Sequence, residues 1–134
     1  MIEPLITVLT PTWNRASTLP RLKASLEAQT YPNFEWLIVD DGSTDGTADL
    51  VRQWQLDSAL VIILIERQNG GKHRSVNDGV RAAKGRWIYI VDSDDKLPNR
   101  ALENIASHLP SIEAIPNVAG LSGLKADFSG HIIG

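Results

Sequence analysis

Short apolar runs alternate with amphipathic segments along most of this chain. Four runs of aliphatic and β-branched residues predict buried strands, at residues 5–9, 35–40, 60–65 and 87–91. We expect Thr10-Pro11 to end the first of them. After each strand, apolar residues recur at helical spacing, which predicts helices with buried faces. The expected buried sets are Leu19, Leu22 and Leu26 after a Ser17 cap; Ala48, Val51 and Trp54; Val76, Val80 and Ala83; and Leu102, Ile105 and Leu109.

This alternation of strands and helices predicts an α/β domain of three layers, with a mainly parallel sheet flanked by helices. The nearly continuous apolar run at 60–65 is typical of a parallel strand that is covered on both faces. Residues 118–121 could form a fifth strand, and 123–134 a hairpin or an edge strand. We expect residues 1–134 to be one domain, truncated at the C-terminus and therefore a fragment of a longer protein. Such an open sheet edge favours self-association into a homo-oligomer.

Composition narrows the classes of function. The chain has 134 residues and a net charge of −3, so it lacks the basic footprint of a nucleic-acid-binding protein. It contains no cysteine, which excludes disulfides, thiol nucleophiles and zinc–thiolate sites. No apolar stretch approaches the roughly 20 residues of a membrane helix. We expect a cytoplasmic protein with no transmembrane segment in this chain. Regions outside this chain could hold the protein at the inner face of a membrane.

Acidic residues gather where two of the predicted strands end. Asp92-Ser93-Asp94-Asp95 follows the strand at 87–91, and Asp40-Asp41 ends the strand at 35–40. In parallel sheets, ligands bind beyond these carboxyl ends. Carboxylates so close together repel unless a cation lies between them, and Mg²⁺ or Mn²⁺ prefers such oxygen ligands. The alternatives are a helix-capping turn for the first group and an Asp-Gly turn for the second.

The acidic segments belong to an ordered set of motifs that resembles family 2 glycosyltransferases, enzymes with the GT-A fold that use nucleotide-diphosphate sugars. The set runs from about residue 5 to residue 97. Its members are Thr10-Pro11-Thr12-Trp13-Asn14-Arg15, Val39-Asp40-Asp41-Gly42-Ser43-Thr44-Asp45-Gly46-Thr47, Asn69-Gly70-Gly71-Lys72-His73, Asn77-Asp78-Gly79 and Asp92-Ser93-Asp94-Asp95. The resemblance implies a Rossmann-like GT-A domain that binds the sugar donor.

Roles for individual residues follow from the resemblance. The last segment resembles the D-x-D motif, which implies that Asp94 and Asp95 hold Mn²⁺ or Mg²⁺ and that Asp92 and Asp94 contact the nucleotide. Asp41 would accept a hydrogen bond from N3–H of uracil. The remaining predicted contacts are Thr10 and Pro11 in the base pocket, Lys72 or Arg74 on the donor, and Arg15, which could reach a phosphate or remain solvated. Trp13 follows a strand end near this site.

The resulting prediction is transfer of a sugar, UDP-linked and with inversion, to an acceptor that the sequence does not identify: a saccharide, a lipid or a protein. No catalytic base is assigned, and we expect it beyond Gly134. Two alternatives stay open: a nucleotide-sugar-binding module without catalysis and a metal-dependent nucleotidyltransferase. A receiver-like signalling domain would carry its paired acids after the first strand, where this chain has Thr10-Pro11-Thr12.

Overall fold

The computed structural model describes residues 4–116, 125–126 and 132–133. Four parallel strands form one sheet in the order β3-β2-β1-β4. The elements in chain order are β1 (Ile6–Thr12), α1 (Leu19–Glu27), β2 (Phe34–Asp40), α2 (Thr47–Asp57), β3 (Ile62–Glu66), α3 (Lys72–Ala82), β4 (Trp87–Ile90), α4 (Ala101–Glu113), β5 (Lys125–Ala126) and β6 (Ile132–Ile133). The predicted α/β class with a parallel sheet is confirmed.

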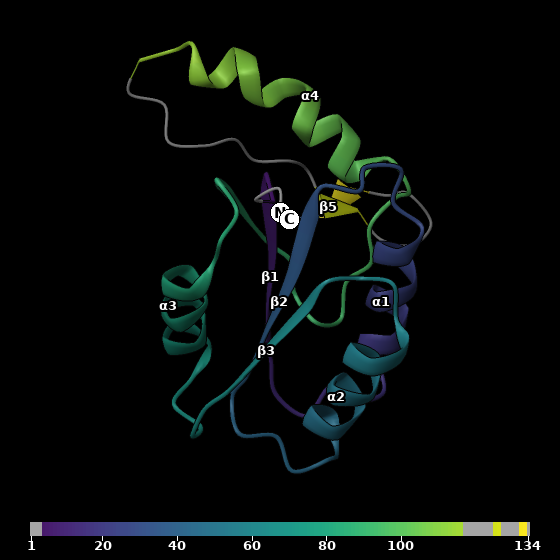
Figure 1. Ribbon diagram of the computed structural model, residues 1–134. Coiled ribbons are helices and arrows are strands. Elements are labelled where there is room, and N and C mark those ends of the chain that lie inside the picture. The colour runs from purple at the N-terminus through teal and green to yellow at the C-terminus, as the bar shows by residue number, and fades with distance from the viewer. Residues whose placement is uncertain (1–3, 117–124, 127–131, 134) are drawn as a thin grey trace.

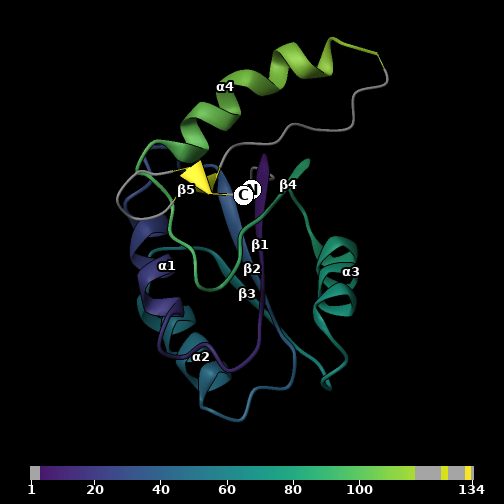
Figure 2. The ribbon, with the colours of Figure 1, turned by 180° about the vertical axis from the view of Figure 1, so that it is seen from behind.

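The three predicted layers are also present. Helices α1 and α2 lie on one side of the sheet and α3 lies on the other (Figure 1), and the view from behind shows the same separation (Figure 2). Because neighbouring strand residues face opposite sides, β1 and β2 supply both cores. Ile6, Val8, Trp36 and Ile38 join the larger cluster with α1, α2 and α4. Leu9, Leu37 and Val39 form a smaller cluster, against which Val76 and Ala83 pack.

The first strand is longer than the sequence predicts. We expected Thr10-Pro11 to end it, but β1 pairs with β2 through Thr12, where Thr12 lies opposite Asp40. On its other side, β1 pairs with β4 only from Ile6 to Leu9. A proline is tolerated in a strand where its missing N–H has no partner to serve. The expected end was therefore wrong, and the extension carries Thr12 to the carboxyl edge of the sheet.

Two helix predictions need correction. Thr18, not Ser17, is the residue before α1, and it makes no side-chain capping bond; a proline follows in the first turn of the helix. In α3 the expected inward residue Val80 is 47% exposed, whereas Ser75 and Gly79 are buried. Gly79 lies so close to Leu9 that a Cβ atom there would be 2.2 Å from Leu9 Cδ1. This close approach rotates α3 so that its smaller residues face the sheet.

The other buried helix positions follow the prediction closely. Leu19, Leu22 and Leu26 are buried in α1, and Val51 and Trp54 in α2. Leu102 and Leu109 are buried in α4, while Ala48 and Ile105 are half-buried. The predicted strand at 118–121 lies outside the described residues. Within 123–134, the described residues of β5 and β6 pair antiparallel, as a hairpin would.

A buried polar network holds the beginning of β4 beside β1. The Thr7 hydroxyl donates to Glu35 Oε2 at 2.6 Å, and the backbone N–H of Lys84 donates to the same oxygen at 2.8 Å. Gly85 N–H donates to the Thr7 hydroxyl, and a Cβ atom at Gly85 would lie 2.4 Å from Thr7 N. This contact sets where β4 begins, and hence where the acidic segment after it emerges.

Candidate functional site

A cavity of about 310 Å³ lies at the carboxyl end of the sheet. It is lined by the end of β1 and the residues after it, the residue after β2, the start of α3 and the loop after β4. The lining residues are Pro11, Thr12, Trp13, Arg15, Asp41, Lys72, Ser75, Asp92, Ser93 and Asp94. Segments that are distant in the sequence thus meet where parallel α/β sheets bind ligands.

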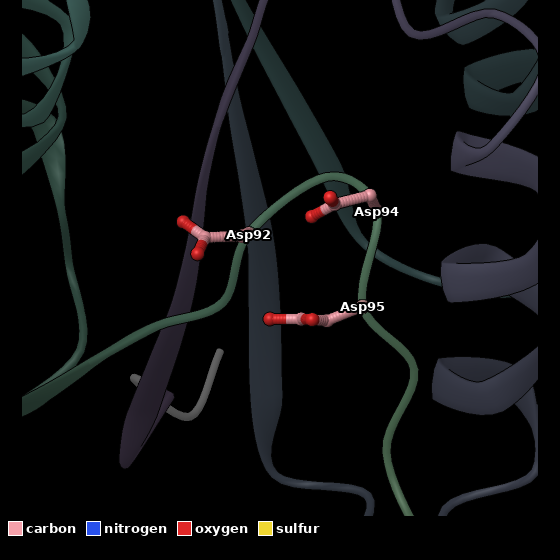
Figure 3. A group of neighbouring side chains, drawn as sticks. All are labelled: Asp92, Asp94 and Asp95. Carbon is pink, nitrogen blue, oxygen red and sulfur yellow. The ribbon is translucent and has the colours of Figure 1, made fainter. Parts of the chain in front are cut away.

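Three carboxylates converge after β4, and two of them, Asp92 and Asp94, line this cavity. Asp92, Asp94 and Asp95 each offer an oxygen, and these oxygens lie within 4.8 Å of one another (Figure 3). A turn brings them together, because Asp95 N–H donates to the Asp92 carbonyl at 3.1 Å. Lys72 Nζ lies 2.6 Å from Asp92 Oδ1, so one cation already faces the cluster. An all-oxygen set of this size fits a hard divalent cation such as Mg²⁺ or Mn²⁺.

Asp41 also lines this cavity, and it is buried. Its two carboxylate oxygens accept the backbone N–H groups of Gly70 and Gly71 at 3.0 and 2.9 Å, respectively. Arg67 Nε lies 3.3 Å from Oδ1. A carboxylate has about four acceptor positions, so Asp41 retains capacity for a ligand N–H on Oδ2. The loop before α3 therefore fixes the orientation of this carboxylate.

Asp40 has a different environment from its neighbour. Its carboxylate accepts the Ser43 hydroxyl and is not part of the cavity lining. Burial raises the pKa of Asp40 above its ordinary value of 3.8, although the Ser43 hydrogen bond opposes this shift. Of the two acids that end β2, only Asp41 faces the cavity.

The loops after β1 and β2 are joined by hydrogen bonds through short polar side chains. Asn14 adopts a positive φ of 51°, donates its N–H to Ser43 Oγ at 2.8 Å and accepts the Thr44 N–H on its side chain at 2.8 Å. Asp45 accepts the N–H groups of Ala16 and Thr47, each at 3.1 Å. These contacts hold the segment that presents Trp13 and Arg15 to the cavity.

We expect Asp45→Asn to lower the free energy of unfolding by about 1 kcal/mol at pH 7, because it weakens bonds to two backbone donors and to the Thr47 hydroxyl. The Thr47 hydroxyl bond lowers the pKa of Asp45 below 3.8. A group with a lowered pKa in the folded state stabilises above its unfolded-state pKa, and this stability is lost as pH falls through the folded-state value. Urea unfolding at several pH values should show the difference from the unaltered chain shrinking below about pH 4. The exposed Asp57→Asn should show little effect, and a pH-independent difference would contradict this assignment.

The structure brings most of the predicted site residues together. Pro11, Arg15, Asp41, Lys72, Asp92 and Asp94 all line the cavity, and Asp95 joins the carboxylate cluster. Arg74, the alternative to Lys72, is not in the lining. Thr10 is the exception among the named base-pocket residues. It is buried, and its hydroxyl accepts the Trp36 indole N–H at 3.0 Å instead of lining the cavity.

Sequence reasoning missed three hydroxyl residues in the lining: Thr12, Ser75 and Ser93. Thr12 could have been found by continuing the strand alternation past Pro11. Ser75 lies one turn into α3, and the spacing of the valines in this helix predicts that a different face is buried. Ser93 lies between two acids of the D-x-D-like segment, at the position where that motif accepts any residue. Small hydroxyl residues carry a weak sequence signal because they occur in many surface positions.

Comparison with known proteins identifies the family. The model of glycosyl transferase family 2 matches residues 7–119, and this chain belongs to that family. The glycosyltransferase GlyG of Streptococcus pneumoniae serotype 4 is 33% identical over 113 residues, which cover 84% of this chain. Among solved structures, S. aureus TarS in complex with UDP-GlcNAc has a TM-score of 0.75, with 29% identity over 81% of this chain. Mannosyltransferase PcManGT of Pyrobaculum calidifontis, in complex with GDP-Man and Mn²⁺, has a TM-score of 0.74, with 33% identity over 86%.

These similarities support the predicted GT-A fold and show how much of the relatives they span. The matched part is 38% of GlyG, 32% of the TarS chain and 34% of the PcManGT chain. The neighbours bind nucleotide sugars with different bases, so membership of the family leaves the donor open. Among the described residues, no helix combines the length and apolar character needed to cross a membrane.

Proposed function

We propose that this chain is the donor-binding part of a glycosyltransferase that takes a UDP-linked sugar through a divalent cation. One observation carries the proposal: a single cavity is lined both by the buried Asp41 and by Asp92 and Asp94, which form an acidic cluster with Asp95. A nucleotide-diphosphate has a hydrogen-bonding base at one end and charged phosphates at the other. The cavity offers a fixed acceptor for the first and a cation site for the second.

Asp41 is the proposed reader of the base. The imide N3–H of uracil can donate to its carboxylate, whereas cytosine and adenine present a ring nitrogen that accepts. The N–H groups of Gly70 and Gly71 hold the carboxylate in place, so little ordering remains to be done when a base binds. Pro11 lines the same cavity, and we propose that it contacts the base. The UDP preference is supported by this chemistry and by the TarS complex with UDP-GlcNAc.

Asp94 and Asp95 are the proposed ligands of Mn²⁺ or Mg²⁺, with Asp92 beside them and in contact with the nucleotide. Such a cation neutralises the diphosphate and stabilises it as it leaves. Lys72, paired with Asp92 in the structure, is positioned to contact a phosphate oxygen when the donor occupies the cavity. Arg15 lines the same cavity and could supply a second positive charge. The PcManGT complex with Mn²⁺ is consistent with a metal at this site.

The transfer itself would proceed with inversion to an acceptor that is still to be identified. It needs a general base on the acceptor hydroxyl. Among the described residues, the acids that line the cavity are Asp41, Asp92 and Asp94. Asp41 is assigned to the nucleotide's uracil ring, and Asp92 and Asp94 are assigned to the nucleotide and its metal ion. We therefore propose that the general base is not one of the acids that line the cavity in the described part of the chain.

A panel of nucleoside diphosphates tests the donor class. Thermal unfolding should be followed with UDP, CDP, GDP and ADP at one concentration, each with Mn²⁺. A ligand that binds only the folded state raises the melting temperature, so UDP should give the largest rise. If GDP raised the melting temperature more than UDP, the donor would be guanosine-linked and not uridine-linked, and the proposed nucleotide site would still stand. No rise with any of the four would reject the proposed function.

A further inference from the structure

Two buried hydroxyls in the cavity lining have no hydrogen-bond partner. Within the described part of the chain, Thr12 Oγ1 and Ser75 Oγ are the two buried side-chain polar atoms in this state. Thr12 is 3% exposed, Ser75 is 0% exposed, and both residues line the cavity. An unpaired buried hydroxyl costs free energy, and native structures pair the great majority of such groups. Both exceptions occurring in one cavity indicates that a ligand supplies the missing partners.

The two residues approach Asp41 from opposite layers of the domain. Thr12 ends β1, and its carbonyl accepts the Asp41 N–H at 2.9 Å. Thr12 is on the same strand face as Thr10, whose hydroxyl meets Trp36 in the core under α1 and α2. Ser75 comes from α3 on the other side of the sheet. Its N–H donates to the carbonyl of Gly71, whose own N–H binds Asp41 Oδ2. Thr12 and Ser75 therefore reach the cavity from opposite sides of the sheet, and each is linked to Asp41 through the backbone.

We propose that Thr12 and Ser75 are specificity-determining residues that donate hydrogen bonds to the two carbonyl oxygens of uracil. This inference rests on the proposed function. The hydrogen-bonding edge of uracil presents O4, N3–H and O2, an acceptor, a donor and an acceptor. Hydroxyl, carboxylate and hydroxyl supply the complementary donor, acceptor and donor. Asp41 alone would form a hydrogen bond to one group of the base, N3–H. With the two hydroxyls, the site would form hydrogen bonds to three groups of the base.

The required movement is small. Both hydroxyl oxygens are shielded from solvent in the structure. Each can be redirected by rotation about χ1 between staggered rotamers, without displacement of the backbone. Because neither hydroxyl has a partner to give up, the rotation breaks no existing hydrogen bond. Binding of the base would therefore gain two bonds at the cost of two side-chain rotations.

The test combines two variants with two altered bases. Thr12→Val and Ser75→Ala each remove a hydroxyl with little change in shape. Calorimetric titration with Mn²⁺ should give Kd values for UDP, 2-thio-UDP and 4-thio-UDP on the unaltered chain and on each variant. We expect each variant to bind UDP about 2- to 10-fold more weakly. On the unaltered chain, UDP should bind more tightly than either thio analogue. In each variant, UDP and one of the two analogues should bind almost equally, because the hydroxyl that distinguishes them is gone and the effects of two groups in contact are not additive.

Melting temperatures separate this role from a structural one. Removal of an unpaired buried hydroxyl should leave the melting temperature unchanged or raise it, whereas loss of a structural bond would lower it. If the unaltered chain fails to bind UDP with Mn²⁺, the proposed function fails and the inference fails with it. If it binds and both variants bind equally well, only the inference is overturned. If the variants bind UDP more weakly but still bind each thio analogue more weakly than UDP by the same factor as the unaltered chain, the hydroxyls contact another part of the ligand and the inference is overturned.

Discussion

Asp94→Asn and Asp95→Asn are each expected to weaken Mn²⁺-dependent UDP binding by about 10- to 100-fold or more. Loss of an outer-shell partner of a metal ligand already costs about 10- to 100-fold in affinity, and a direct ligand should cost no less. The carboxylate oxygens of the cluster lie within 4.8 Å of one another, so each neutral amide removes one charge from a small oxygen set. Calorimetric titration of UDP with Mn²⁺ measures the change directly.

Stability is the control for this result. Repulsion among nearby carboxylates opposes folding in the absence of a cation, so neither variant should lower the melting temperature of the metal-free chain. Asp57→Asn, which removes an exposed acid at the end of α2, should bind UDP normally. Wild-type affinity in both cluster variants would remove Asp94 and Asp95 from the metal site and favour the helix-capping interpretation of this turn.

Asp41→Asn is expected to collapse the preference for UDP over CDP. The amide keeps the size of the side chain but offers one acceptor oxygen and an NH₂ group, which would meet the N–H groups of Gly70 or Gly71 or of the base. A buried donor left without its acceptor costs about 1–3 kcal/mol, so UDP affinity should fall by about 5- to 150-fold. CDP, which has no imide N–H, should lose far less. Competition titration of the two nucleotides on one preparation gives the ratio.

The adjacent acid provides a matched control. Asp40 ends the same strand, but its carboxylate meets Ser43 and does not line the cavity. Asp40→Asn should therefore preserve the ratio of UDP to CDP affinity, whatever its effect on stability. If Asp41→Asn keeps the wild-type ratio, or if Asp40→Asn changes it as much, Asp41 is not the base reader.

The alternation of apolar and polar residues was sufficient to predict the layers, and the resemblance to family 2 glycosyltransferases supplied most of the site residues. Strand ends in a parallel sheet share one edge, so the sequence predicts that the acids after β2 and β4 lie near each other. The packing of helices against the sheet was harder to predict from the sequence. Gly79 brings α3 against Leu9 and turns Val80 outward, which depends on the distance between two elements and not on helical periodicity. Thr10 and Thr12 are both threonines on one face of β1, and Thr12 lines the cavity because β1 continues past the expected end at Thr10-Pro11.

The central claim is that Asp41 and the acidic cluster form one metal-dependent nucleotide site. Calorimetric titration of the unaltered chain with UDP, once with Mn²⁺ and once with EDTA, tests it most directly. We expect saturable binding with Mn²⁺ at one site per chain, and loss of that binding when the metal is chelated. Absence of binding with Mn²⁺, or binding of equal strength in EDTA, would contradict it.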